Sequence, residues 1–150
     1  MVGEPLVFIS YTAADRETAR AVAAGLKLRG VAYFRDEECD QPGSIQQMVT
    51  RWLEAASHFL FIASRHSINA PWPSLEVAAA NDRAINGKLK FIPALFGLQR
   101  HDLPLLIRDW IPVDLSDPEA ALARVAGWVV ASADGPAGPA LGDLKGVPPP

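Results

Sequence analysis

The sequence is poor in the residues that build disulfides and metal centres. Its 150 residues include one cysteine, Cys39, and three scattered histidines, His58, His66 and His101. A single cysteine cannot form a disulfide within the chain, and a zinc site needs about four suitably spaced ligands. We therefore expect neither a disulfide scaffold nor a metal site, and we predict a reducing, cytoplasmic location.

Long apolar runs and basic clusters are also missing. No apolar run approaches the roughly 18 residues that a membrane span needs. The N-terminal segment MVGEPLVFIS has no basic region and no small-residue cleavage site, so no signal peptide is predicted. The 14 Lys and Arg residues are scattered and the net charge is −3. These features argue against a membrane or a nucleic acid as a direct partner.

What remains is an alternation of short apolar runs with segments of helical periodicity. The apolar runs are rich in branched and aromatic side chains and predict buried strands. Gly30 is placed to end the first helix, and Pro93, which has no N–H, predicts an edge position or a bulge in the fourth strand. The predicted strands are residues 5–10, 31–34, 58–64, 89–96 and 110–115, and the predicted helices are residues 15–29, 44–56, 73–85 and 117–130.

This alternation predicts the fold class. Strands that are apolar on both faces and alternate with helices indicate a parallel sheet covered on both sides. Right-handed crossovers leave few arrangements, of which we predict the flavodoxin-like one, an α/β fold with five parallel strands in the order 2-1-3-4-5. In such sheets the functional crevice lies at the carboxyl ends of the strands, where the strand order reverses beside strand one.

The last part of the chain has a different composition. Residues 131–150, ASADGPAGPALGDLKGVPPP, contain five prolines and four glycines and show neither a helical nor a strand period. This composition is typical of a linker or disordered tail. We therefore predict one domain over residues 1–130, followed by a linker to a further module of the same chain, such as a sensor or an NTPase.

The segment APWPSLEVAAA, residues 70–80, places Trp72 and Glu76 four positions apart at the start of a predicted helix. A glutamate in a first helical turn is common because the helix dipole favours it, and a tryptophan there often packs on a neighbouring loop. The alternative is a site that stacks a flat ring on Trp72 and holds a sugar or a cation against Glu76. The spacing alone leaves both interpretations open.

Three segments in register resemble the Toll/interleukin receptor (TIR) domain family, in its bacterial type. FISYTAAD, residues 8–15, resembles the first-strand signature of the family. DEECDQPGSI, residues 36–45, resembles the BB loop after strand two, with its Pro-Gly turn. SRHSINAPWPSLEVAAA, residues 64–80, resembles the segment in which a Trp precedes a Glu by four residues. The resemblance extends from about residue 5 to residue 130 and implies the flavodoxin-like fold.

The resemblance also implies a function. Many TIR domains cleave NAD between nicotinamide and ribose, and others only assemble with further TIR domains as signalling adaptors. By resemblance Glu76 is the catalytic carboxylate and Trp72 lies at the edge of the nicotinamide pocket. The further substrate-binding residues implied are Ser10, Tyr11 and Thr12 after strand one, and Arg35 and Gly43 in the BB loop. NAD is then a substrate, and no cofactor is expected.

The chemistry is consistent with a single carboxylate. Loss of nicotinamide leaves positive charge on the ribose, which a nearby carboxylate stabilises, and the leaving group departs neutral without an acid. We therefore expect an NAD hydrolase, the effector module of a larger bacterial defence or signalling protein, whose activity depends on self-association with other TIR domains. The main alternative is a non-catalytic TIR scaffold, and a nucleoside deoxyribosyltransferase-like enzyme is a further one. A response-regulator receiver is rejected because strand three ends in IAS without a phosphorylatable aspartate, and a flavodoxin because SYTAAD has no glycine.

Overall fold

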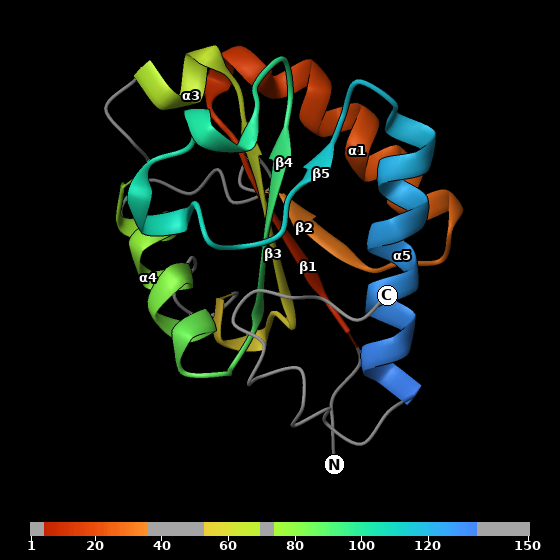
Figure 1. Cartoon of the computed structure of the whole chain (residues 1–150). Coiled ribbons are helices and arrows are strands. Elements are labelled where there is room, and N and C mark those ends of the chain that lie inside the picture. Colours follow the sequence, from red (N-terminus) through yellow and green to blue (C-terminus); the bar gives the residue numbers. More distant parts are fainter. Residues whose placement is uncertain (1–4, 36–52, 70–73, 135–150) are drawn as a thin grey trace, which may run out of the picture.

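The computed structural model describes residues 5–35, 53–69 and 74–134, which form a parallel five-stranded sheet with helices on both faces (Figure 1). The strand order is β2-β1-β3-β4-β5. This order confirms the predicted flavodoxin-like arrangement. The strands are β1 (Val7–Ser10), β2 (Tyr33–Arg35), β3 (His58–Ala63), β4 (Lys90–Leu95) and β5 (Val113–Asp114).

The helices form two layers. Figure 1 shows α1 and α5 on one side of the sheet and α4 on the other. The helices are α1 (Arg16–Leu28), α3 (Arg65–Asn69), α4 (Ser74–Ile85) and α5 (Pro118–Asp134), and residues 53–55 are also helical. Short 3-10 turns lie at η1 (Ala13–Asp15), η3 (Arg100–Asp102) and η4 (Leu105–Ile107). None of the helices in the described ranges is long and apolar enough to cross a membrane.

The two faces of the sheet have different cores. On one face aliphatic side chains of β1, β3 and β4 pack against α1 and α5. The other face carries a row of rings, in which Phe59 lies 5.3 Å from Phe8 and 5.1 Å from Phe91 between ring centroids. Trp110 extends the row at 6.2 Å from Phe91. Because side chains alternate along a strand, the apolar runs fill both cores and hold the strand ends in place.

Helices α1 and α4 each end at a glycine, because the chain must reverse into the next strand. Gly30 has φ 74°, and the N–H of Val31 donates to the carbonyl of Leu26 at 2.9 Å. Gly87 has φ 73° and ends α4 with the corresponding hydrogen bonds. A left-handed residue after the last helical turn favours glycine, which has no Cβ to clash. The predicted role of Gly30 is confirmed.

The prediction for Pro93 is wrong. β4 lies between β3 and β5 and is not an edge strand. Pro93 pairs in register with Phe61 of β3, without a bulge. The expectation assumed that every N–H of an inner strand donates to one of its two neighbouring strands.

The backbone of β4 shows why the proline is tolerated. The N–H groups of Lys90 and Phe96 donate to carbonyls on the β3 side. Because successive N–H groups point in opposite directions, the nitrogen of Pro93 faces the β5 side. β5 pairs with β4 only at Ala94 and Leu95, so no hydrogen-bonded partner strand lies opposite the missing N–H.

Other element boundaries differ modestly from the predictions. β2 begins at Tyr33 instead of residue 31, and β5 has two residues. The last helix continues to Asp134, four residues past its predicted end at 130. The five-residue helix α3 was not predicted. Most of the predicted helix 44–56 and the remaining tail, residues 135–150, lie outside the described residues.

Candidate functional site

The carboxyl ends of β1, β2 and β3 lie side by side at one edge of the sheet. Ser10, the last residue of β1, pairs with Phe61 of β3, and Ile9 pairs with Arg35 of β2. The chain leaves β1 for α1 on one face, and it leaves β3 for α3 and α4, of which α4 covers the opposite face. The strand order reverses between β1 and β3, which is where ligands bind in sheets of this kind.

The residues after β1 combine buried and partly exposed groups. Ser10 is fully buried, and the ring of Tyr11 packs in the core formed with α1 and α5. Thr12 is half-buried, and its Oγ1 donates to Asp15 Oδ2 at 3.1 Å. The structure thus places these three predicted residues at the expected edge, and their role in substrate binding stays a prediction.

The other predicted residues are placed only in part. Arg35 is the last residue of β2, and its backbone lies next to the end of β1. Glu76 is the third residue of α4, so its backbone lies in the first turn of that helix. Gly43 and Trp72 lie outside the described residues. The sheet therefore brings Ser10 and Arg35 to one edge, and the function of each residue remains predicted.

A polar network missed in the sequence joins the ends of β1 and β3. Asp15 is only 3% exposed, and its carboxylate accepts a hydrogen bond from the hydroxyl of Ser64 at 2.6 Å. The hydroxyl of Thr12 donates to the same oxygen. Asp15 belongs to η1, whereas Ser64 follows β3 directly, 49 positions along the chain. The network therefore spans the point where the strand order reverses.

Ser64 also organises the first turn of α3. Its Oγ accepts the N–H of His66 at 3.1 Å and that of Ser67 at 3.3 Å. Its own N–H donates to Ser67 Oγ at 2.8 Å. Hydroxyl groups that follow an apolar strand directly were the available signal, since parallel strands end at a common edge.

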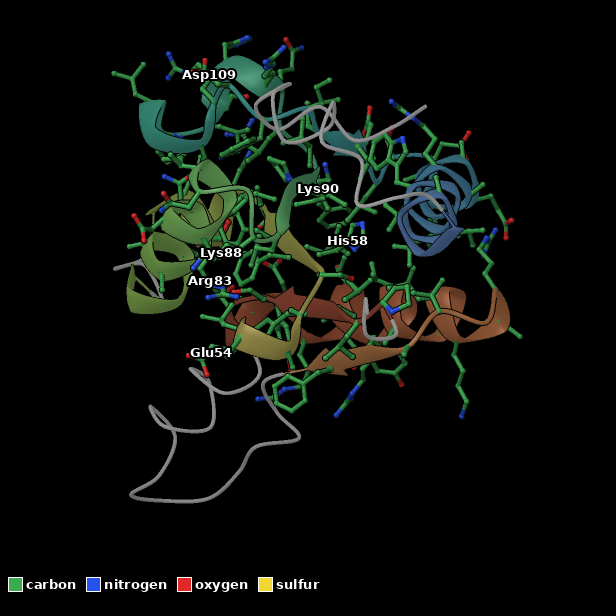
Figure 2. All side chains as sticks on the ribbon, turned by 90° about the horizontal axis from the view of Figure 1, so that it is seen from below. Glu54, His58, Arg83, Lys88, Lys90 and Asp109 are labelled. Carbon is green, nitrogen blue, oxygen red and sulfur yellow. The ribbon has the colours of Figure 1, made fainter. Side chains whose placement is uncertain are left out.

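Figure 2 views the molecule from the opposite, amino-terminal edge of the sheet, where His58 and Lys90 lie next to each other. His58 is fully buried, and its Nδ1 lies 2.7 Å from Ser57 Oγ. Burial and, to a smaller extent, the charge of Lys90 lower the pKa of His58 from 6.5 to about 4. Partial burial also lowers the pKa of Lys90. These groups face away from the candidate site and bear on stability.

The connection between β4 and β5 contains a separate open hollow of about 410 Å³, lined by Arg100, His101, Arg108 and Asp109. Backbone carbonyls hold both guanidinium groups, since Arg100 donates to the carbonyl of Arg108 and Arg108 donates to that of Leu103. The hollow includes none of the predicted site residues. Within residues 5–35, 53–69 and 74–134, no three His, Cys, Asp or Glu side chains are grouped to hold a metal.

Comparison with known proteins identifies the family. The sequence matches the TIR domain family over residues 7–126, which is most of the chain. The chain therefore belongs to the TIR domain family, as its three motifs and its strand order indicate. No curated protein matches the chain significantly.

Solved structures of TIR proteins share the fold. The TIR-STING receptor from C. gigas in complex with 2′,3′-cGAMP superposes with a TM-score of 0.70 at 22% identity, over 82% of this chain and 38% of the receptor. The TIR domain of the Toll-related receptor TRR-2 from Hydra magnipapillata gives 0.68 at 16% identity, over 83% of this chain and 97% of that domain. The TIR domains of the activated Roq1 resistosome give 0.58 at 17% identity, over 83% and 84%. The chain thus spans about two fifths of the C. gigas receptor and nearly all of the Hydra domain.

Proposed function

We propose that this TIR domain hydrolyses NAD at the bond between nicotinamide and ribose, with Glu76 as the catalytic carboxylate. The observation that carries the proposal is the position of Glu76 in the first turn of α4, the helix that follows the carboxyl end of β3 through α3. The family to which the chain belongs includes NAD-cleaving enzymes, and their catalytic glutamate occupies the matching position in the Trp-xxx-Glu motif.

The reaction needs little acid-base chemistry. The bond between the ribose carbon and the pyridinium nitrogen breaks, and its electron pair moves into the ring, so nicotinamide leaves neutral. The ribose carries the positive charge until water adds and loses a proton, which gives ADP-ribose. An ionised carboxylate stabilises this charge, and a helix N-terminus favours the ionised form by about 0.3–1 kcal/mol.

The remaining predicted residues receive roles in binding. Trp72 supplies a flat apolar wall for nicotinamide. We assign Ser10, Tyr11 and Thr12, which lie at and directly after the end of β1, to contacts with the substrate. In the proposed complex Arg35 and Gly43 contribute from the end of β2 and the BB loop. NAD is the substrate, and the reaction as written requires no resident cofactor.

The test is nicotinamide release by the purified domain at high protein concentration with a crowding agent. Glu76→Gln should lower kcat by about 100-fold or more, because it removes the negative charge that opposes the ribose cation. Glu119→Gln is the matched control, since Glu119 also lies in a first helical turn, that of α5, and is largely exposed. The control should stay within about twofold of the wild type. Equal activity in the wild type and Glu76→Gln would remove Glu76 from the mechanism.

The second candidate function is a scaffold that acts by TIR–TIR association. The likeness to TIR domains of the Roq1 resistosome, which is an assembly, supports it. We expect the two functions to act together, with self-association raising the specific activity of the domain within a larger defence or signalling protein. Light scattering and nicotinamide release are measured across the same protein concentrations. An assembled sample that cleaves no NAD would favour the scaffold alone.

A further inference from the structure

Asp15 occupies a helix-capping position without capping the helix. It is the N-cap residue of α1, yet its side chain makes no capping hydrogen bond. An N-cap aspartate ordinarily accepts a backbone N–H from the first helical turn. Here the carboxylate accepts the hydroxyls of Ser64 at 2.6 Å and Thr12 at 3.1 Å instead. Local helix stability therefore does not explain this side chain.

The Asp15 carboxylate lies in a buried environment with hydroxyl donors as its partners. The residue is 3% exposed, and no Lys, Arg or His in the described part of the chain forms an ion pair with it. Burying a carboxylate against neutral hydroxyls alone is unfavourable compared with leaving it in water. The 2.6 Å distance to Ser64 is at the short end of the range for hydroxyl donors. The arrangement holds two segments together through one buried polar side chain.

The two segments lie on either side of the point where the strand order reverses. Asp15 ends η1, which follows the predicted substrate-binding residues Ser10 to Thr12. Ser64 begins the turn into α3, and α3 contacts both η1 and β3. The chain reaches Glu76 of α4 seven residues after α3 ends at Asn69. The hydrogen bond between Asp15 and Ser64 thus connects the two chain segments that flank the candidate site.

We propose that Asp15 is a positioning residue that fixes α3 against the loop after β1, and thereby sets the geometry in which Glu76 meets the substrate. The catalytic consequence rests on the proposed NAD hydrolysis, whereas the structural consequence does not. Asp15 acts through Ser64, and neither residue needs to touch the reacting atoms.

The first test measures amide hydrogen exchange. Asp15→Ala should accelerate exchange of the α3 amides by about tenfold or more, the factor expected when a buried hydrogen bond is lost, and leave α5 unchanged. Asp15→Asn keeps an oxygen acceptor and should restore part of the protection. Asp117→Ala is the matched control, because Asp117 caps α5 by accepting the N–H of Ala120 at 3.3 Å. Unchanged exchange of the α3 amides in Asp15→Ala would overturn the proposal.

The second test measures kcat and KM for nicotinamide release, at a temperature where thermal scans show every variant to be folded. Asp15→Ala should lower kcat by about tenfold, while Asp117→Ala stays within about twofold. In the double variant Asp15→Ala should add little to the effect of Ser64→Ala, since both substitutions remove the hydrogen bond between Asp15 and Ser64. Wild-type kcat in Asp15→Ala would overturn the proposal. An inactive wild type would contradict NAD hydrolysis instead, and the exchange experiment would still decide the role of Asp15.

Discussion

At the scale of single residues, His58 makes stability depend on pH. Its pKa is lowered to about 4 in the folded protein from 6.5, so the unfolded chain binds more protons between these values. The stabilisation is complete above pH 6.5 and is lost as the pH falls toward 4, by about 2 kcal/mol between pH 7.5 and pH 5. Urea unfolding at the two pH values measures this difference.

The control for His58 is a histidine on the surface. His101→Gln should leave the pH dependence unchanged, because the His101 side chain is 73% exposed. His58→Gln should reduce the dependence, whatever its effect on stability at neutral pH. An undiminished pH dependence in His58→Gln would show that other groups cause it.

A second residue-scale prediction concerns the buried hydrogen bond from Trp110 Nε1 to Asn81 Oδ1, which is 2.7 Å long. Asn81→Ala deprives the buried indole N–H of this acceptor, so the free energy of unfolding should fall by about 1–3 kcal/mol. Asn86 follows the last residue of the same helix and is exposed. Asn86→Ala should therefore lower the free energy of unfolding by at most about 0.5 kcal/mol. Equal effects of the two substitutions would contradict a structural role for the buried bond.

The candidate site shows at this scale what sequence can and cannot reveal. The motifs predicted Ser10 and Glu76 as site residues, and the structure has Ser10 at the end of β1 and the backbone of Glu76 in the first turn of α4. The helical periodicity identified Asp15 only as the start of a helix. Its bond to Ser64 joins positions 49 apart and depends on the strand order, so no local pattern contains it.

At the scale of elements, the contact between α1 and α5 depends on Gly25. A Cβ at this position would overlap Cδ1 of Leu122. Gly25→Ala gains about 1 kcal/mol of helix propensity, but the overlap offsets it by about 1–3 kcal/mol. In a Leu122→Ala background the same substitution should therefore be stabilising. A double-mutant cycle by urea unfolding measures the coupling.

Gly127 provides the matched comparison. It lies in α5, and nothing lies within 4 Å of a Cβ built there. Gly127→Ala should stabilise the protein by about 0.5–1 kcal/mol, since only helix propensity changes. If Gly25→Ala stabilised the wild type as much as Gly127→Ala does, close packing at Gly25 would be ruled out.

Strands and long helices could be predicted because their apolar periodicity reports burial on one or two faces. Helix α3 could not, since its first turn is organised by Ser64 and Ser67 instead of by an apolar stripe. Pro93 was misplaced because sequence does not show where β5 begins to pair. Both errors concern tertiary partners, which override local preference.

At the scale of the whole molecule, both cores share one sheet, so we expect a single cooperative unfolding transition. Trp110 belongs to the core on the α4 face, and Trp128 to the core on the α1 and α5 face. Fluorine NMR of fluorotryptophan-labelled protein follows each ring separately during urea unfolding. Of the four tryptophan signals, the native signals of Trp110 and Trp128 should disappear at the same urea concentration, and separated midpoints would show that the faces unfold independently.

The glycines that end α1 and α4 have a consequence for how this fold can diverge. Both lie where the chain passes from the end of a helix to the start of a strand, at the amino-terminal edge of the parallel sheet and opposite the candidate site. Of the three left-handed glycines in the described residues, these two lie at the edge that carries no predicted chemistry, and Gly97 follows β4 at the carboxyl edge. Loops at the carboxyl edge can lengthen or change composition without disturbing the turns at Gly30 and Gly87. New substrate preferences can thus evolve by insertion at one edge while the other keeps the sheet in register.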